Sequence, residues 1–159
     1  RWREADWVIA GDLNDYVETI GPLGIVTPAR PSGLDPLLSD FAVNPVSKLP
    51  PHERWTHFHK DWSEAKQRLI EEHVQLDYVL LSPALAARAP LGVEIIRRGQ
   101  PYRVPLDPRA ADRSISNLSD AGGRYPRIGW DRPKASDHCP LIVTVNLPER
   151  NHENARGSR

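Results

Sequence analysis

Three short apolar segments of this chain each border acidic or histidine side chains. They are residues 5–11 (ADWVIAG), 75–82 (QLDYVLLS) and 139–147 (CPLIVTVNL). Their length and their apolar and β-branched content predict buried strands. Asp12 and Asn14 follow the first segment, Asp77 lies inside the second, and Asp137 and His138 precede the third. If these strands share a sheet, their polar ends meet at one rim, where an α/β sandwich places its site.

Length and composition limit the kind of protein further. The chain has 159 residues, with 21 Lys and Arg against 21 Asp and Glu, so it has room for one domain and no overall charge to attract nucleic acid. A single cysteine excludes a disulfide framework. No apolar run approaches the roughly 20 residues of a membrane-spanning helix. The chain has no methionine and opens at Arg1, so we expect further residues upstream.

Two segments have the features of helices. Residues 35–43 carry Asp35 as a cap and Pro36 at the first helical position, which predicts a short helix. Residues 62–74 are rich in helix formers and predict a second helix. Its apolar face would consist of Ala65, Leu69, Ile70 and His73.

The remaining chain divides into two further strands, one loop and a tail. Alternation over residues 54–59 (RWTHFH) and the apolar residues of 92–98 (GVEIIRR) predict strands. Residues 99–135 contain five prolines and four glycines, which predicts a long functional loop. Residues 148–159 form a polar tail without core-forming side chains.

Asp77 is the most unusual of the polar residues. It is flanked by Leu76 and by the apolar run that starts at Tyr78, and a carboxylate buried there without a partner would be costly. His138 is available as that partner. We therefore expect Asp77 and His138 to pair, so that the carboxylate orients the imidazole and favours its protonated form. The turn chemistry of Gly11–Asn14 and of residues 136–138 is the structural alternative.

Together these side chains could perform phosphoryl chemistry. A protonated His138 would donate to a phosphoryl oxygen, Asp12 would align or deprotonate a water, and Asn14 would donate to the phosphate. Asp137 would help to hold a hard divalent cation through oxygen ligands.

The motifs GDLND (11–15), LDYVLLSP (76–83) and ASDHCPLIV (135–143) occur in this order, each at the boundary of an expected strand. In this they resemble the carboxyl-terminal half of the endonuclease/exonuclease/phosphatase superfamily, which has the deoxyribonuclease I-like fold. RWTHF (54–58) also resembles the family's strand before the middle motif.

The resemblance implies an α/β (α+β) fold, namely half of a two-sheet sandwich flanked by helices. Residues 1–147 would be the carboxyl-terminal part of one such domain, and residues 148–159 its tail. It also implies attack of water on phosphorus with Mg²⁺, or alternatively Mn²⁺, with Asp12, Asn14, Asp77 and His138 as catalytic residues and Asp137 as a metal ligand. Because the family's first half supplies a further metal-binding glutamate, we expect the fragment to be inactive alone.

A nuclease is the function that these observations favour, with nucleic acid as the substrate. The alternatives are a lipid or small-molecule phosphodiesterase, a phosphomonoesterase of the same fold, or a binding module without catalysis. Residues 97–134 contain nine basic and four acidic residues, which could bind a phosphate backbone or form a solvated face. Trp130 could stack on a base or pack in the interior.

Two histidines and the cysteine have structural as well as functional interpretations. His57 and His59 would share a face of one strand, as metal ligands can, but the sequence identifies no third ligand for them. Cys139 adjoins His138 in a strand where neighbours point to opposite faces, so we expect a small buried apolar residue rather than a nucleophile.

Overall fold

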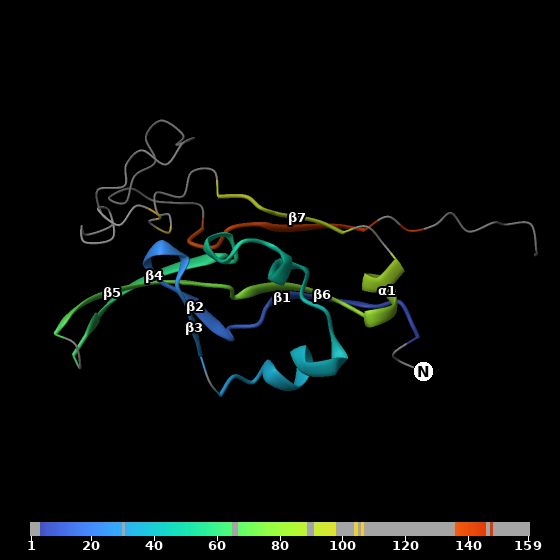
Figure 1. Ribbon diagram of the computed structural model, residues 1–159, viewed down its shortest axis with the longest axis horizontal. Coiled ribbons are helices and arrows are strands. Elements are labelled where there is room, and N and C mark those ends of the chain that lie inside the picture. Colours follow the sequence, from blue (N-terminus) through green and yellow to red (C-terminus); the bar gives the residue numbers. More distant parts are fainter. Residues whose placement is uncertain are drawn as a thin grey trace, which may run out of the picture.

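A computed structural model describes residues 4–29, 31–64, 67–88, 91–97, 104, 106, 136–145 and 147 of the chain. Within these residues the protein is a mixture of strands and a few short helices, and every strand pair is antiparallel. The strands form three small sheets: the sheet with β4 and β5 lies towards one end of the long axis, and the β1–β6 and β7–β8 sheets run side by side next to it (Figure 1). The architecture is of the α+β kind.

The first sheet pairs two of the segments that carry the candidate site. Strand β1 (Val8–Asp12) runs antiparallel to β6 (Asp77–Leu81), and their register sets Asp12 opposite Asp77. A further backbone bond, from the N–H of Leu13 to the carbonyl of Leu76 at 2.9 Å, continues the pairing past this point. The two aspartates therefore meet at the same end of the sheet.

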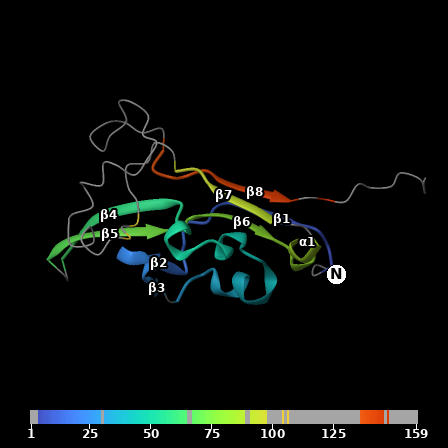
Figure 2. The ribbon, with the colours of Figure 1, turned by 45° about the horizontal axis from the view of Figure 1, so that its top comes forward.

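The second sheet has the order β3-β2-β5-β4. Its strands are β2 (Glu18–Ile20), β3 (Val26–Pro28), β4 (His57–Ser63) and β5 (Arg68–Val74). The β4–β5 pair forms a long hairpin at one end of the molecule (Figures 1 and 2). His57, the first residue of β4, pairs with Val74, the last residue of β5, so this end of the hairpin adjoins the loop that leads into β6.

The third sheet brings the last segment to the site. Strand β7 (Leu91–Ile95) pairs with β8 (Leu141–Val145), and Figure 2 shows this pair running beside β6 and β1. An isolated antiparallel bridge joins His57 to His138, just before β8 begins. One end of each sheet thus lies in the same region of the molecule.

The helices are short, and one of them, η3 (Pro45–Lys48), contributes Val46 to the core. Helix α1 (Pro83–Arg88) follows β6 directly, and the Ser82 hydroxyl accepts a hydrogen bond from the N–H of Leu85 at 3.2 Å, as an N-terminal cap does. Pro83 fits the first helical position because its missing N–H needs no partner there. The other helical turns are η1 (Pro22–Gly24), η2 (Leu37–Phe41), η3 (Pro45–Lys48) and η4 (Pro51–Glu53).

Two clusters of buried side chains form the core. One packs Trp55 and Phe58 with residues from several elements, and its buried members are Ile20, Val46, Trp55, Phe58, Ile95, Val104 and Cys139. The other includes two residues of β6, and its buried members are Leu34, Ala42, Tyr78 and Leu80. Cys139 is 2% exposed and belongs to the first cluster, which confirms its expected packing role.

The prediction of a helix at residues 62–74 is wrong. These residues end β4, turn, and form β5, with Gln67 in the left-handed region at φ 49° and its side-chain amide donating to the Glu64 carbonyl at 2.8 Å. Strand β5 pairs with β4 on one side and β2 on the other. Pairing with β4 along its whole length, and with β2 at His73 and Val74, stabilises the strand more than the local helix propensity favours a helix.

The other expected elements are found with shifted bounds. The strand at 54–59 begins at His57, and the helix at 35–43 is reduced to η2, with Pro36 rather than Asp35 at its cap. Strand β1 is less buried than expected for 5–11: Val8 is 52% exposed, because the described structure pairs β1 with β6 alone. The loop at 99–135, apart from residues 104 and 106, and the tail at 148–159 lie outside the described residues.

Within the described part of the chain, none of the helices has the length and apolar character required to cross a membrane.

Candidate active site

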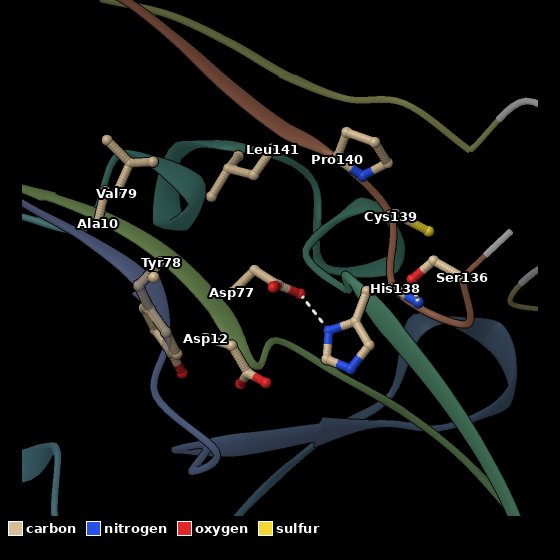
Figure 3. Close-up of a pocket in the computed structure, with 11 residues that line it drawn as sticks. Ala10, Asp12, Asp77, Tyr78, Val79, Ser136, His138, Cys139, Pro140 and Leu141 are labelled. Atoms are coloured by element: carbon tan, nitrogen blue, oxygen red, sulfur yellow. Dashed lines mark hydrogen bonds and ion pairs between the residues drawn. The ribbon is translucent and has the colours of Figure 1, made fainter.

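An open pocket of about 360 Å³ lies where β1, β6 and the segment before β8 meet. Figure 3 shows the side chains around it, with Asp77 and His138 pointing toward one another and Asp12 beside them. Its lining consists of Ala10, Gly11, Asp12, Asp77, Tyr78, Val79, Ser136, His138, Cys139, Pro140 and Leu141. All three sequence motifs thus contribute residues to one pocket.

The pairing expected for Asp77 is present. Asp77 Oδ2 lies 2.8 Å from His138 Nδ1, within hydrogen-bond distance, and the two side chains are 24% and 29% exposed. The contact leaves His138 Nε2 as the nitrogen available to a ligand. This is the geometry in which a carboxylate fixes the orientation and tautomer of an imidazole.

Thr56 holds the backbone around this pair in place. It is fully buried, and its hydroxyl oxygen accepts hydrogen bonds from the N–H groups of Leu76 at 3.0 Å and Asp77 at 3.1 Å. Its own N–H donates to the Val74 carbonyl at 3.0 Å, and its carbonyl accepts from the Cys139 N–H at 2.7 Å. One residue therefore connects the start of β4, the entry to β6 and the segment that carries His138.

Asp12 and Asn14 occupy different positions relative to the pocket. Asp12 lines it, and its Oδ1 accepts a hydrogen bond from the Asn14 N–H at 2.9 Å. Asn14 has φ 50°, a conformation that asparagine tolerates better than most residues, and it is not among the described residues that line the pocket. The structure brings Asp12 to the Asp77–His138 pair and gives Asn14 a turn geometry, while its role as a donor stays a prediction.

Asp137 lies on the other side of His138 and contacts a histidine. Its Oδ2 is 3.4 Å from His57 Nε2, and the rings of His57 and His138 have centroids 4.8 Å apart. The Asp137 side chain is 61% exposed, whereas that of His57 is 14% exposed. Asp137 thus faces solvent beside two imidazoles, and it is not part of the described pocket lining.

We compared the chain with known proteins. No protein-family model, no curated protein and no solved structure matches it. The resemblance to the endonuclease/exonuclease/phosphatase superfamily therefore depends on the motifs themselves.

The surroundings of His138 raise its pKa, and those of Asp137 lower its pKa. Partial burial alone lowers the pKa of His138, but the hydrogen bond and charge of Asp77, with the charges of Asp12 and Asp137, offset this and raise the pKa above its usual value. The pKa of Asp137 is lowered by a hydrogen bond from its own backbone N–H and, against a burial penalty, by the hydrogen bond and charge of His57 and the charge of His138.

We expect this raised pKa to fall when the carboxylate is removed. In Asp77→Asn the ring keeps its place but loses the neighbouring charge, so the pKa of His138, measured from its ring protons by NMR titration, should move down. The matched control is Asp40→Asn in η2, because Asp40 does not act on His138. An unchanged His138 pKa in Asp77→Asn would contradict the electrostatic role of the pair.

The same shift links folding to pH. Because the folded pKa of His138 lies above the unfolded value, the pair stabilises the fold fully below the unfolded pKa, and this contribution disappears as pH rises through the folded pKa. Asp77→Asn should weaken this pH dependence of the free energy of unfolding, because only the smaller contributions of Asp12 and Asp137 to the raised pKa remain.

Sequence reasoning did not indicate Thr56, and it assigned the wrong partners to His57 and to Arg97, which lies outside the site. Thr56 gave no signal beyond its place in RWTHF, because a threonine in an alternating strand is common. His57 was paired with His59, whereas the structure joins it to Asp137 and His138. Arg97 was grouped with the basic residues of 97–134, but its guanidinium lies 4.7 Å over the Trp55 ring and donates to the carbonyls of Glu53 and Trp55.

The other basic residues of that segment, like Trp130, lie outside the described residues.

Proposed function

We propose that this chain, completed by residues outside it that supply a further metal ligand, hydrolyses phosphodiesters with a divalent cation and that its substrate is a nucleic acid. The observation that carries the proposal is the 2.8 Å contact between Asp77 Oδ2 and His138 Nδ1 in a pocket that Asp12 also lines. A carboxylate–imidazole pair beside a second carboxylate is a general acid–base arrangement. The pocket volume of about 360 Å³ is within the range of small-ligand sites.

In this proposal each side chain has one task. Asp77 fixes the imidazole through Nδ1, so that the Nε2 proton of His138 points toward a phosphoryl oxygen and stabilises the negative charge that develops there. Asp12 accepts a proton from the attacking water as the new oxygen–phosphorus bond forms and the bond to the leaving oxygen breaks. Asn14 donates to the phosphate if its side chain turns toward the pocket.

The acidic residues suit the cation that the resemblance implies. Asp12 and Asp137 are exposed carboxylates, and Mg²⁺ binds proteins through one or two carboxylates while keeping several waters. Asp137 would hold Mg²⁺, or Mn²⁺ in its place. The bound cation would supply positive charge against the charge on the phosphate oxygens.

The deoxyribonuclease I-like fold and the preference for nucleic acid are part of the same proposal. The antiparallel sheets with few helices, and the order of the three motifs around one pocket, support the fold. The nine basic residues of 97–134 support a polyanionic substrate, although Arg97 is occupied by Trp55.

The test is a hydrolysis assay on the protein together with any residues that flank it naturally. We expect Mg²⁺-dependent cleavage of duplex DNA, single-stranded DNA or RNA, faster than cleavage of bis-nitrophenyl phosphate, and complete loss of cleavage on chelation. If the protein cleaves only the small ester or a lipid phosphodiester, nucleic acid is not its substrate class. Activity that survives chelation, or binding of nucleic acid without hydrolysis under any divalent metal, would overturn the proposal.

A further inference from the structure

A second group of possible metal ligands lies next to the pocket and shares one residue with it. His57, Asp137 and His138 each offer a ligand atom, and these atoms all lie within 4.8 Å of one another. Atoms at such separations can approach a common ion with small side-chain movements. The group differs in chemistry from Asp12, Asp77 and His138, because it contains two imidazoles and only one carboxylate.

Backbone contacts hold the two imidazoles side by side. The antiparallel bridge between His57 and His138 sets their backbones opposite one another, and the bond from the Cys139 N–H to the Thr56 carbonyl continues this pairing. The rings are tilted by 51° with centroids 4.8 Å apart. The arrangement thus depends on strand pairing rather than on flexible surface side chains.

Asp77 supplies the support that metal-binding histidines usually have. Its contact with His138 Nδ1 leaves Nε2 as the nitrogen that can face an ion. A histidine ligand typically donates its other ring N–H to a carboxylate, which fixes the tautomer and strengthens the bond to the metal. Asp137, 61% exposed, leaves the group open to ions from solvent.

We propose that His57, Asp137 and His138 form a binding site for a divalent transition metal such as Zn²⁺. Imidazole favours Zn²⁺, Co²⁺ and Ni²⁺ over Mg²⁺ and Ca²⁺, which prefer oxygen ligands. Three protein ligands leave coordination positions for water, as in open zinc sites.

The site has a consequence that rests on the proposed function. A transition metal bound here occupies both His138 and Asp137, the proton donor and the Mg²⁺ ligand of the proposed hydrolysis. Zn²⁺ therefore inhibits the Mg²⁺-dependent reaction, and His57 determines how strongly it does so.

The direct test is metal binding, measured without any assay of activity. We expect Co²⁺ to give the visible absorption bands of a protein-bound ion, Zn²⁺ to displace it, and calorimetry to show a stoichiometry of one Zn²⁺ per chain, all at a pH above the His138 pKa. His57→Ala should weaken Zn²⁺ binding beyond the roughly 10- to 100-fold expected for Asp77→Asn, which removes only the supporting carboxylate. His52→Ala is the matched control, because His52 contacts Glu53 and lies outside the group.

Asp137→Asn is a second variant that should also weaken Zn²⁺ binding. Because the Asp137 side chain is exposed, misfolding would not account for a loss of binding in this variant. The proposal is overturned if no Co²⁺ band forms, or if His57→Ala and Asp137→Asn bind Zn²⁺ as the wild type does. Zn²⁺ inhibition, expressed relative to each variant's own activity, should be weaker in His57→Ala. Binding of Zn²⁺ without any phosphodiester hydrolysis would sustain this site and reject the proposed function.

Discussion

Replacing His138 with alanine is expected to lower phosphodiester turnover by roughly 10²- to 10⁴-fold, the range for a lost general acid or transition-state donor. Asp12→Asn should cause a loss of the same order, because the amide cannot accept a proton from water. Both residues line the pocket and both are at least partly exposed, so both variants should fold, and His138→Ala should lose only the stability that its contact with Asp77 contributes. Steady-state kinetics with Mg²⁺, alongside thermal unfolding, measures the two effects separately.

The control for these variants is Asp40→Asn, an exposed carboxylate in η2 outside the pocket lining. It should retain wild-type turnover. Asp77→Asn should be milder than His138→Ala, since the imidazole remains and only its orienting charge is lost. A His138→Ala protein with wild-type turnover on every substrate would remove His138 from the mechanism.

Thr56→Val should destabilise the fold by roughly 2–6 kcal/mol, because it leaves two part-buried N–H groups without their acceptor at a cost of about 1–3 kcal/mol each. The donors are the N–H groups of Leu76 and Asp77, and Thr56 is fully buried, so water cannot replace the hydroxyl without rearrangement. The size and shape of the side chain are conserved. Urea unfolding monitored by tryptophan fluorescence measures the change in the free energy of unfolding.

Thr56→Ser is the matched variant, because it keeps the hydroxyl oxygen and loses one methyl group, at a cost of about 1 kcal/mol. Equal destabilisation by valine and serine would mean that packing of the methyl group, rather than the two hydrogen bonds, is what Thr56 contributes.

The strands that carry the candidate site were predictable because their signals are local. Residues 77–81 form a strand whose only charged residue stands at its first position, and burial beside Leu80 and Leu81 makes the need of Asp77 for a partner evident from the sequence. His138 was the partner to expect, and their pairing is confirmed. The arrangement of Asp12 across from Asp77 follows from strand register, which the sequence does not encode locally.

The parts that could not be predicted depend on distant pairing. Strand β5 forms because β4 and β2 flank it, although its own residues favour a helix. The contact of His57 with Asp137 requires the bridge between β4 and the segment before β8, which lie 80 residues apart in the chain. Thr56 acquires its importance only when three segments converge on it.

Asp77 is the first residue of β6, whereas His138 precedes β8 and is bridged to His57 at the start of β4. No single sheet contains the pair, and the β1–β6 and β7–β8 sheets have only two strands each, a size that is marginally stable in isolation. The pair therefore assembles at the step in which the sheets dock, and it separates when they part. A local opening that separates the β7–β8 pair from β6 would break the site before global unfolding, so hydrogen exchange of the amide protons in that pair measures how often the site opens.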